Sequence, residues 1–135
     1  MKKTSLYNEH VNLKAKIVDF AGYQMPIQYS GIIQEHLAVR KSCGIFDVSH
    51  MGEFIISGSE ATKFLNEITT NDVSKINEWQ AQYSAMCYED GGIIDDILVY
   101  KYPDHYMLVV NCANIEKNFD WISANKPENV DFANI

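Results

Sequence analysis

Residues 93–100 read Ile93-Ile94-Asp95-Asp96-Ile97-Leu98-Val99-Tyr100, and this stretch decides how the middle of the chain folds. Its β-branched and aromatic side chains are typical of a strand. Two adjacent carboxylates, Asp95 and Asp96, interrupt the apolar run. Because successive side chains of a strand point to opposite faces of a sheet, the two carboxylates are expected on opposite faces. At most one of them can serve a given site.

Turn residues on both sides of this stretch predict its neighbours in the sheet. Asp90-Gly91 and Pro103-Asp104 separate three strand-like runs, which cover residues 82–88, 93–102 and 105–110. Turns of this composition typically join antiparallel strands. The three runs are therefore expected to form a meander.

The positions of the two turns predict the register of the meander. The first turn pairs Asp96 with Ala85 and Tyr83 with Leu98, and the second turn pairs Asp96 with Asn111. On this register one face of the sheet carries Tyr83, Asp96, Leu98 and Asn111. A single β-bulge at either turn would reverse the face.

This shared face has two interpretations. A carboxylate, a phenol and an amide in a dry, apolar surround form a polar cluster that can bind a ligand rich in N–H donors. The other interpretation is that Asp96 lies on the solvated side of a half-exposed antiparallel sheet. The same plain interpretation applies to Asp95, for which nothing nearby in the sequence indicates a role.

Helices are expected on either side of the meander. Ser57 and Glu60 have the spacing of a capping box, and apolar residues recur at helical spacing across residues 61–68. Asn114 is expected to cap a last helix. Residues 130–135 then alternate between apolar and polar side chains, as a strand does.

The N-terminal part predicts a hairpin followed by a helix. Residues 15–20 and 24–29 read as extended pieces joined by a turn, and residues 32–42 read as a helix ended by Gly44. Residues 45–56 read as extended. Together the elements predict an α+β fold of antiparallel sheets with helices packed on one side.

The expected domain organisation is one interrupted region. An incomplete first subdomain is expected to consist of about residues 1–52 and 126–135. An α+β subdomain of about residues 53–125 is expected to be inserted into it. The terminal strand has no closing helix or polar tail after it. We therefore expect this chain to be the N-terminal piece of a longer protein.

The composition argues against several classes of partner. The chain carries 11 basic and 18 acidic residues, a formal charge of −7, with a pI near 4.9. Such a surface repels phosphate backbones and anionic lipids, so neither nucleic acid nor a membrane is an expected partner. The three cysteines and four histidines lack the spacing of metal ligands, which argues against a metal site. The cysteines are odd in number and far apart, which argues against a disulfide framework and fits the reducing cytoplasm.

Five short motifs resemble one known family, the aminomethyltransferase of the glycine cleavage system, also called T-protein. The similarity runs from residue 3 to about residue 122 and covers about the first third of a family member. The motifs are Val18-Asp19-Phe20-Ala21-Gly22 with Met25-Pro26, Phe46-Asp47-Val48-Ser49-His50-Met51-Gly52-Glu53, Asn71-Asp72-Val73-Ser74, Gly91-Gly92-Ile93-Ile94-Asp95-Asp96, and Val110-Asn111 with Ala113-Asn114-Ile115-Glu116-Lys117.

The resemblance implies a fold, a reaction and partners. Family members are ring-like, three-part molecules with folate in a central cavity. They take the aminomethyl group from the lipoyl arm of the carrier H-protein, release ammonia and give 5,10-methylenetetrahydrofolate from tetrahydrofolate. Since only the N-terminal portion is matched, the piece alone is expected to be inactive.

The resemblance also implies site residues. Asp96 matches the critical acid of the family, and Met51, Tyr83 and Asn111 match positions at the folate site. From sequence alone, Met51 and Tyr83 are more often core or sheet residues, and Asn111 is equally interpreted as a helix cap. His50 is interpreted as structural, because no carboxylate or serine nucleophile is placed with it.

Two other functions compete with the aminomethyltransferase. One is a non-catalytic folate-binding module of the same superfamily, against which the acidic balance and the Asp-Asp pair argue. The other is the C-terminal segment of a demethylating oxidase, which would have a flavin domain upstream. The motifs begin at residue 3, which argues against that arrangement.

Overall fold

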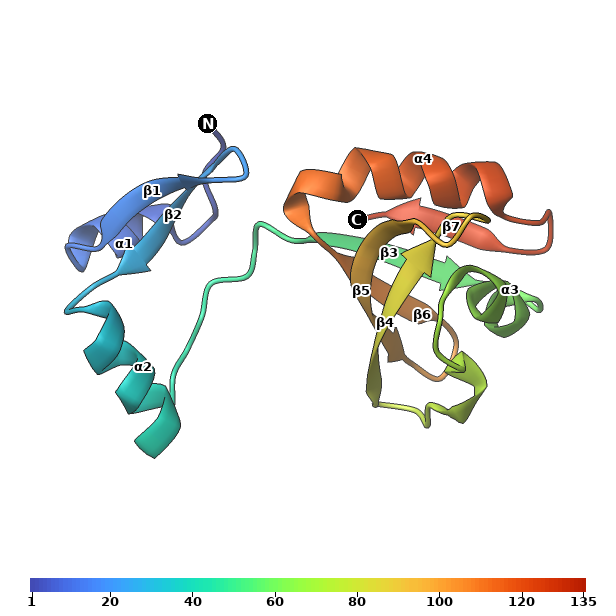
Figure 1. The fold of residues 1–135 in the computed structure, drawn as a ribbon, viewed down its shortest axis with the longest axis horizontal. Coiled ribbons are helices and arrows are strands. Elements are labelled where there is room, and N and C mark those ends of the chain that lie inside the picture. The colour runs from blue at the N-terminus through green and yellow to red at the C-terminus, as the bar shows by residue number, and fades with distance from the viewer. The chain divides into compact units, whose positions relative to one another are not determined.

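The computed structural model describes residues 1–135 and divides into two compact units, Met1–His50 and Met51–Ile135 (Figure 1). Residues 126–135, which the sequence assigned to the first subdomain, lie in the second unit, because their strand pairs with residues 54–57 of that unit. None of the helices combines the length and the apolar character that crossing a bilayer requires.

The first unit contains a β-hairpin and two helices. Its elements are α1 (Tyr7–Asn12), β1 (Lys16–Phe20), β2 (Tyr23–Gln28) and α2 (Ile32–Lys41). β1 and β2 pair antiparallel, which confirms the expected hairpin. The extended run expected from residue 45 is wrong in its first half, because no strand begins before Gly52.

The second unit is an antiparallel sheet of five strands in the order β4-β5-β6-β3-β7. The strands are β3 (Gly52–Ser57), β4 (Ala81–Cys87), β5 (Ile93–Lys101), β6 (Tyr106–Val110) and β7 (Asp131–Asn134). The expected meander is thus confirmed as β4, β5 and β6. The helical elements are α3 (Ala61–Ile68), η1 (Val73–Lys75), η2 (Cys112–Asn114) and α4 (Ile115–Asn125).

One face of this sheet forms the hydrophobic core with α3 and α4. Alternate residues of β3, β5 and β6 are buried, and they form one cluster with Phe64 and Leu65 of α3 and Ile122 of α4. The opposite face carries no helix and its apolar side chains are only half-buried. The predicted α+β class with helices on one side is confirmed.

The terminal strand β7 closes the sheet beside β3. Ile56 pairs with Phe132, whose ring packs against Phe54 and Phe119 with centroid distances of 5.3 and 4.9 Å. This aromatic cluster explains why residues 126–135 belong to the second unit.

The helix starts differ from the expected caps. Ser57 is the last residue of β3, and Glu60 occupies the N-cap of α3 without a side-chain hydrogen bond, so the predicted capping box is wrong. Asn114 does occupy the N-cap of α4, but its side chain makes no capping bond. Its amide nitrogen instead donates to Oδ1 of the charged Asp95 carboxylate at 2.7 Å, a charge-assisted hydrogen bond.

Candidate functional site

The predicted register of the meander is confirmed. Ala85 pairs with Asp96 and Tyr83 pairs with Leu98 across β4 and β5. Ile97 pairs with Val110, which brings the following residue of that strand, Asn111, beside Asp96. A register shift occurs between Met86 and Cys87, on the turn side of Asp96, and therefore leaves its face unchanged.

Three of the predicted site residues form one hydrogen-bonded group. The Tyr83 hydroxyl donates to Oδ2 of Asp96 at 3.2 Å, and the Asn111 side-chain amide donates to Oδ1 at 2.9 Å. Met51 lies at the same end of the sheet, because it precedes Gly52, the partner of Val110. The fold thus brings the aromatic and acidic side chains of β4 and β5 together with the amide that follows β6.

The group is open to solvent, in contrast to the expected dry surround. Asp96 is exposed, Tyr83 is 62% exposed, and Met51 and Asn111 are half-buried. The physical reason is that α3 and α4 cover only the other face of the sheet. Within these 135 residues the Asp96 face is the solvated side of the sheet.

Asp96 keeps the neighbouring phenol protonated. The hydrogen bond from Tyr83 to Asp96 raises the pKa of Tyr83 above its ordinary value of 10.0, and the negative charge of Asp96 adds to this. An anionic phenolate would face an anionic carboxylate at 3.2 Å, so the neutral form is favoured. Tyr83 therefore remains a hydrogen-bond donor to higher pH than an ordinary tyrosine.

Asp95, the neighbour of Asp96 in the sequence, is buried and accepts several hydrogen bonds. The sequence did not indicate a role for it. Asp95 is 4% exposed. Its Oδ1 accepts from the side-chain amides of Asn111 at 2.9 Å and Asn114 at 2.7 Å. Its Oδ2 accepts from the side-chain amide of Asn118 at 2.6 Å and the backbone N–H of Asn111 at 3.3 Å.

A pattern that was overlooked in the sequence could have revealed this cluster. Asn111, Asn114 and Asn118 are spaced three and four residues apart, the spacing at which side chains near the start of a helix lie on the same side. Amides on the side that packs on the sheet need hydrogen-bond partners when they are buried. Asp95 is the partner that all three share.

No cation neutralises the two carboxylates. The ion pairs of the chain do not include Asp95 or Asp96. The nearby Lys117 instead donates to the backbone oxygen of Ile94 at 2.6 Å. No group of three or more His, Cys, Asp or Glu side chains is placed to hold a metal ion. The charge of the site therefore suits a ligand with N–H donors or with positive charge.

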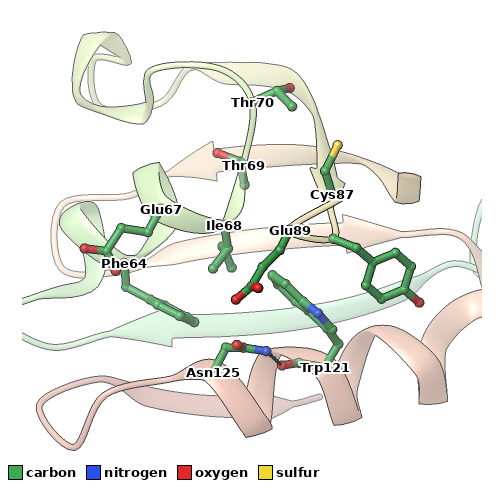
Figure 2. Close-up of a pocket in the computed structure, with 10 residues that line it drawn as sticks. Phe64, Glu67, Ile68, Thr69, Thr70, Cys87, Glu89, Trp121 and Asn125 are labelled. Atoms are coloured by element: carbon green, nitrogen blue, oxygen red, sulfur yellow. Dashed lines mark hydrogen bonds between the residues drawn. The ribbon is translucent and has the colours of Figure 1, made fainter. Parts of the chain in front are cut away.

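A cleft of the second unit lies away from this group. Its volume is about 540 Å³, and it lies between α3, α4 and the turn that joins β4 and β5. Figure 2 shows Trp121 and Glu89 among the residues that line it. None of Met51, Tyr83, Asp96 and Asn111 lines it. The candidate site is thus an open sheet face and not a pocket of this chain.

The first unit holds two buried histidines. His50 packs edge-on against the rings of Phe20 and Tyr23, in line with the structural role expected for it. His10 forms hydrogen bonds of 2.8 Å to both Asp47 and Tyr29. This second arrangement was not predicted from the sequence.

Comparison with known proteins shows that the sequence and the fold are both similar to those of one class of protein. Residues 6–135 match the family model described as the GCVT N-terminal domain. The chain is 56% identical over 129 residues to an aminomethyltransferase of Chloroherpeton thalassium, covering 95% of this chain and 36% of that protein. It is 55% identical over 137 residues to an aminomethyltransferase of Thermotoga maritima, covering 100% of this chain and 38% of that protein.

A solved structure shows the same fold. The crystal structure of the glycine cleavage system aminomethyltransferase T from Bartonella henselae matches 99% of this chain and 38% of that chain, with a TM-score of 0.91 and 31% sequence identity. The matched proteins are thus aminomethyltransferases. The chain belongs to the GCVT N-terminal domain family, which confirms the resemblance found in the sequence, and it spans 36% to 38% of these relatives.

Proposed function

We propose that this chain is the N-terminal part of the folate-binding region of an aminomethyltransferase of the glycine cleavage system. The observation that carries the proposal is the position of Asp96, held between the Tyr83 hydroxyl and the Asn111 amide on a sheet face without helices. The names of the relatives support the same activity. In this reaction the one-carbon unit passes from the aminomethyl-lipoyl arm of H-protein to tetrahydrofolate, and ammonia leaves.

The open sheet face fits a flat ligand that carries N–H groups. Leu98 and Val109 are half-buried on this face and offer apolar contact to a ring. Asp96 has no cation bound to it and can accept from ring N–H groups. Tyr83 and Asn111 would fix the orientation of tetrahydrofolate, and Met51 would supply adaptable apolar contact.

Asp96 is the residue to which we assign the catalytic role. When bound, tetrahydrofolate supplies the nitrogen that accepts the one-carbon unit. The Asp96 carboxylate would orient the ligand and stabilise the positive charge that develops as the bond from the aminomethyl carbon to nitrogen breaks. Tyr83 and Asn111, which donate to its two oxygens, would hold the carboxylate in place.

This role requires a surround that the 135 residues do not supply. Water around an exposed carboxylate weakens its interaction with a developing charge. We therefore assign the exclusion of water to the part of the aminomethyltransferases that this chain does not match. By the same reasoning the piece alone binds folate weakly and does not turn over substrate.

The remaining features of the proposal follow from the reaction. The partner protein is the lipoylated H-protein, which carries the aminomethyl group on its arm. Tetrahydrofolate is the cosubstrate, and the cytoplasm is the proposed compartment. Residues 1–135 form the N-terminal part of the folate-binding region, with their two compact units as its first components.

The test is Asp96→Asn in a full-length aminomethyltransferase that carries this chain. Folate-dependent ammonia release from aminomethyl-loaded H-protein should fall by about 100-fold or more, because a charge that faces the reacting centre is lost. Asp120→Asn makes the same chemical change on an exposed residue of α4 and should leave the rate unchanged. Near-normal turnover in Asp96→Asn would reject the assigned role.

The same experiment separates the alternative function. A non-catalytic folate-binding module would bind tetrahydrofolate but release no ammonia, even with the native Asp96. Binding without turnover by the native full-length protein would therefore favour the module over the enzyme.

A further inference from the structure

We propose that Asp95 is a positioning residue, whose buried carboxylate holds the Asn111 amide in the orientation that presents it to Asp96. The inference rests on the proposed function only through the role of Asp96. Asp95 itself lies on the core side of the sheet and does not contact the open face. Its influence on the reaction would pass through Asn111.

The contacts form a continuous path across the sheet. Oδ1 of Asp95 lies 2.9 Å from the side-chain nitrogen of Asn111, and the same nitrogen lies 2.9 Å from Oδ1 of Asp96. The backbone oxygen of Asp96 is a third acceptor at 3.1 Å. The path continues from Oδ2 of Asp96 to the Tyr83 hydroxyl.

The chemistry of the amide leaves it one orientation. A side-chain amide has two N–H donors on nitrogen, whereas its oxygen only accepts. With a carboxylate oxygen on either side, the nitrogen must face both Asp95 and Asp96, because the amide oxygen would be repelled by each. Both N–H groups of Asn111 are committed in this way.

Burial fixes the orientation of the Asp95 carboxylate, which is one end of this series of hydrogen bonds. Its carboxylate is 4% exposed and accepts four N–H donors, three from side chains and one from the backbone of Asn111. A buried carboxylate that lost these donors would be strongly destabilised, so the arrangement resists rotation. Asp96 is exposed, so its orientation depends on the donors Tyr83 and Asn111 and not on burial.

Asn118 shows how strongly the cluster is organised around this carboxylate. Its side chain is fully buried and donates to Oδ2 of Asp95 at 2.6 Å. The Asn118 amide oxygen has no hydrogen-bond partner. The amide is thus oriented toward Asp95 at the expense of its own acceptor, as expected where an anion dominates the local field.

The decisive experiment is a double-mutant cycle on the folate-dependent reaction of a full-length aminomethyltransferase that carries this chain. Asp95→Asn should lower kcat/KM by about 10- to 100-fold, because the groups at the reacting centre lose their alignment. In the Asn111→Ala background, Asp95→Asn should have no further effect on kcat/KM, since the path is already broken. Equal, additive losses in both backgrounds would overturn the proposal.

A matched control separates positioning from a general loss of stability. Val99→Ala removes buried atoms from the same face of β5, away from Asn111. It should destabilise the fold and leave kcat/KM unchanged under conditions where the protein remains folded. A loss of kcat/KM in Val99→Ala equal to that in Asp95→Asn would mean that stability alone explains the effect.

A spectroscopic readout does not depend on activity. In NMR spectra of the native protein, the side-chain N–H groups of Asn111 should exchange slowly with water, and Asp95→Asn should make them exchange freely. Unchanged protection in Asp95→Asn would show that Asp95 does not fix the Asn111 amide, and would overturn the proposal. If the native protein shows this protection but no folate-dependent turnover, the proposed function fails while the hold of Asp95 on Asn111 stands.

A second variant covers the outcome in which Asp95→Asn does not fold. Asp95→Ser is smaller and leaves room for water to replace the lost acceptors. The same cycle with Asn111→Ala applies to it, with the same expected absence of additivity. Additive losses there would contradict the proposal equally.

Discussion

The side-chain nitrogen of Asn111 lies 2.9 Å from a carboxylate oxygen of Asp95 and 2.9 Å from a carboxylate oxygen of Asp96. Asn111 follows the last residue of β6, where the strand has ended, so its side chain is not confined to one face of the sheet. One amide thereby joins the buried face to the exposed face. The two neighbouring acids of β5 are linked although they point in opposite directions.

Removing the charge of Asp96 should change the titration of Tyr83. The hydrogen bond to Asp96 raises the pKa of Tyr83 above 10.0, so the phenol keeps its proton to higher pH than an ordinary tyrosine. Asp96→Asn should return the pKa of Tyr83 toward 10.0. NMR of carbon-13-labelled tyrosine measures this, with Tyr83→Phe identifying the resonance. A pKa that stays raised in Asp96→Asn would show that the carboxylate is not its cause.

Asp47 should make the first unit sensitive to acid. Burial alone would raise the pKa of Asp47, but hydrogen bonds from His10, Ser49 and Thr4 outweigh it and hold the pKa well below the ordinary value of 3.8. A depressed pKa contributes stability that is present above pH 3.8 and is lost as the pH falls toward the folded value. The first unit should therefore lose stability below about pH 4.

Asp47→Asn tests this contribution at neutral pH. We expect a loss of about 3 kcal/mol, because the variant breaks a buried pair with His10 in which the Asp47 side chain is 1% exposed. Native-state amide exchange measures both losses, at β1 and β2 for Asp47→Asn and at β5 and β6 for its control. Asp104→Asn is the control, since that side chain is 85% exposed and its pair with His105 should contribute less than about 0.5 kcal/mol. Equal losses would contradict the assignment.

Gly58 should resist substitution far more than Gly91. A Cβ added to Gly58 would lie 2.3 Å from the backbone oxygen of Asn129, and its φ of +108° disfavours any other residue. Gly58→Ala should cost about 2 to 4 kcal/mol in unfolding free energy. Gly91 has a φ of +84° with open space around it, so Gly91→Ala should cost about 1 kcal/mol. Urea denaturation of both variants should show this order, and a reversed order would count against the described turn.

Ser57 should contribute little to the stability of α3. Its side chain caps nothing, so Ser57→Ala should change the unfolding free energy by less than about 0.5 kcal/mol. Asp72 is the matched comparison, because its carboxylate accepts from the backbone N–H of Ser74 at 3.0 Å. Asp72→Ala should cost about 1 kcal/mol. A loss of that size in Ser57→Ala would mean that the capping box forms after all.

Local sequence patterns were sufficient for the strand pairing around Asp96. The turns at Asp90-Gly91 and Pro103-Asp104 are short, so they restrict which residues of adjacent strands can face each other. Side-chain alternation then places Tyr83, Asp96 and Asn111 together. These rules act between neighbours along the chain, and for that reason they can be applied without a structure.

The predicted helix caps were wrong at residues that also contact an element distant in the sequence. Ser57 and Glu60 have the spacing of a capping box, but Ser57 is paired with Asp131 of β7, far along the chain. Asn114 has the position of a cap, but its side chain is turned so that the amide nitrogen donates to the buried Asp95 carboxylate, and its oxygen caps no backbone N–H group. Local preference was overridden by a tertiary contact in both cases.

The sequence by itself determined the parity of Asp95 and Asp96 and the register that unites the polar group, because a pleated strand allows only two faces. Only the tertiary structure decided which of the two acids is buried. That choice depends on where α4 packs, since this helix brings Asn114 and Asn118 to Asp95 and leaves Asp96 on the face without helices. Burial is a property of the assembled layers, and no local pattern along β5 contains it.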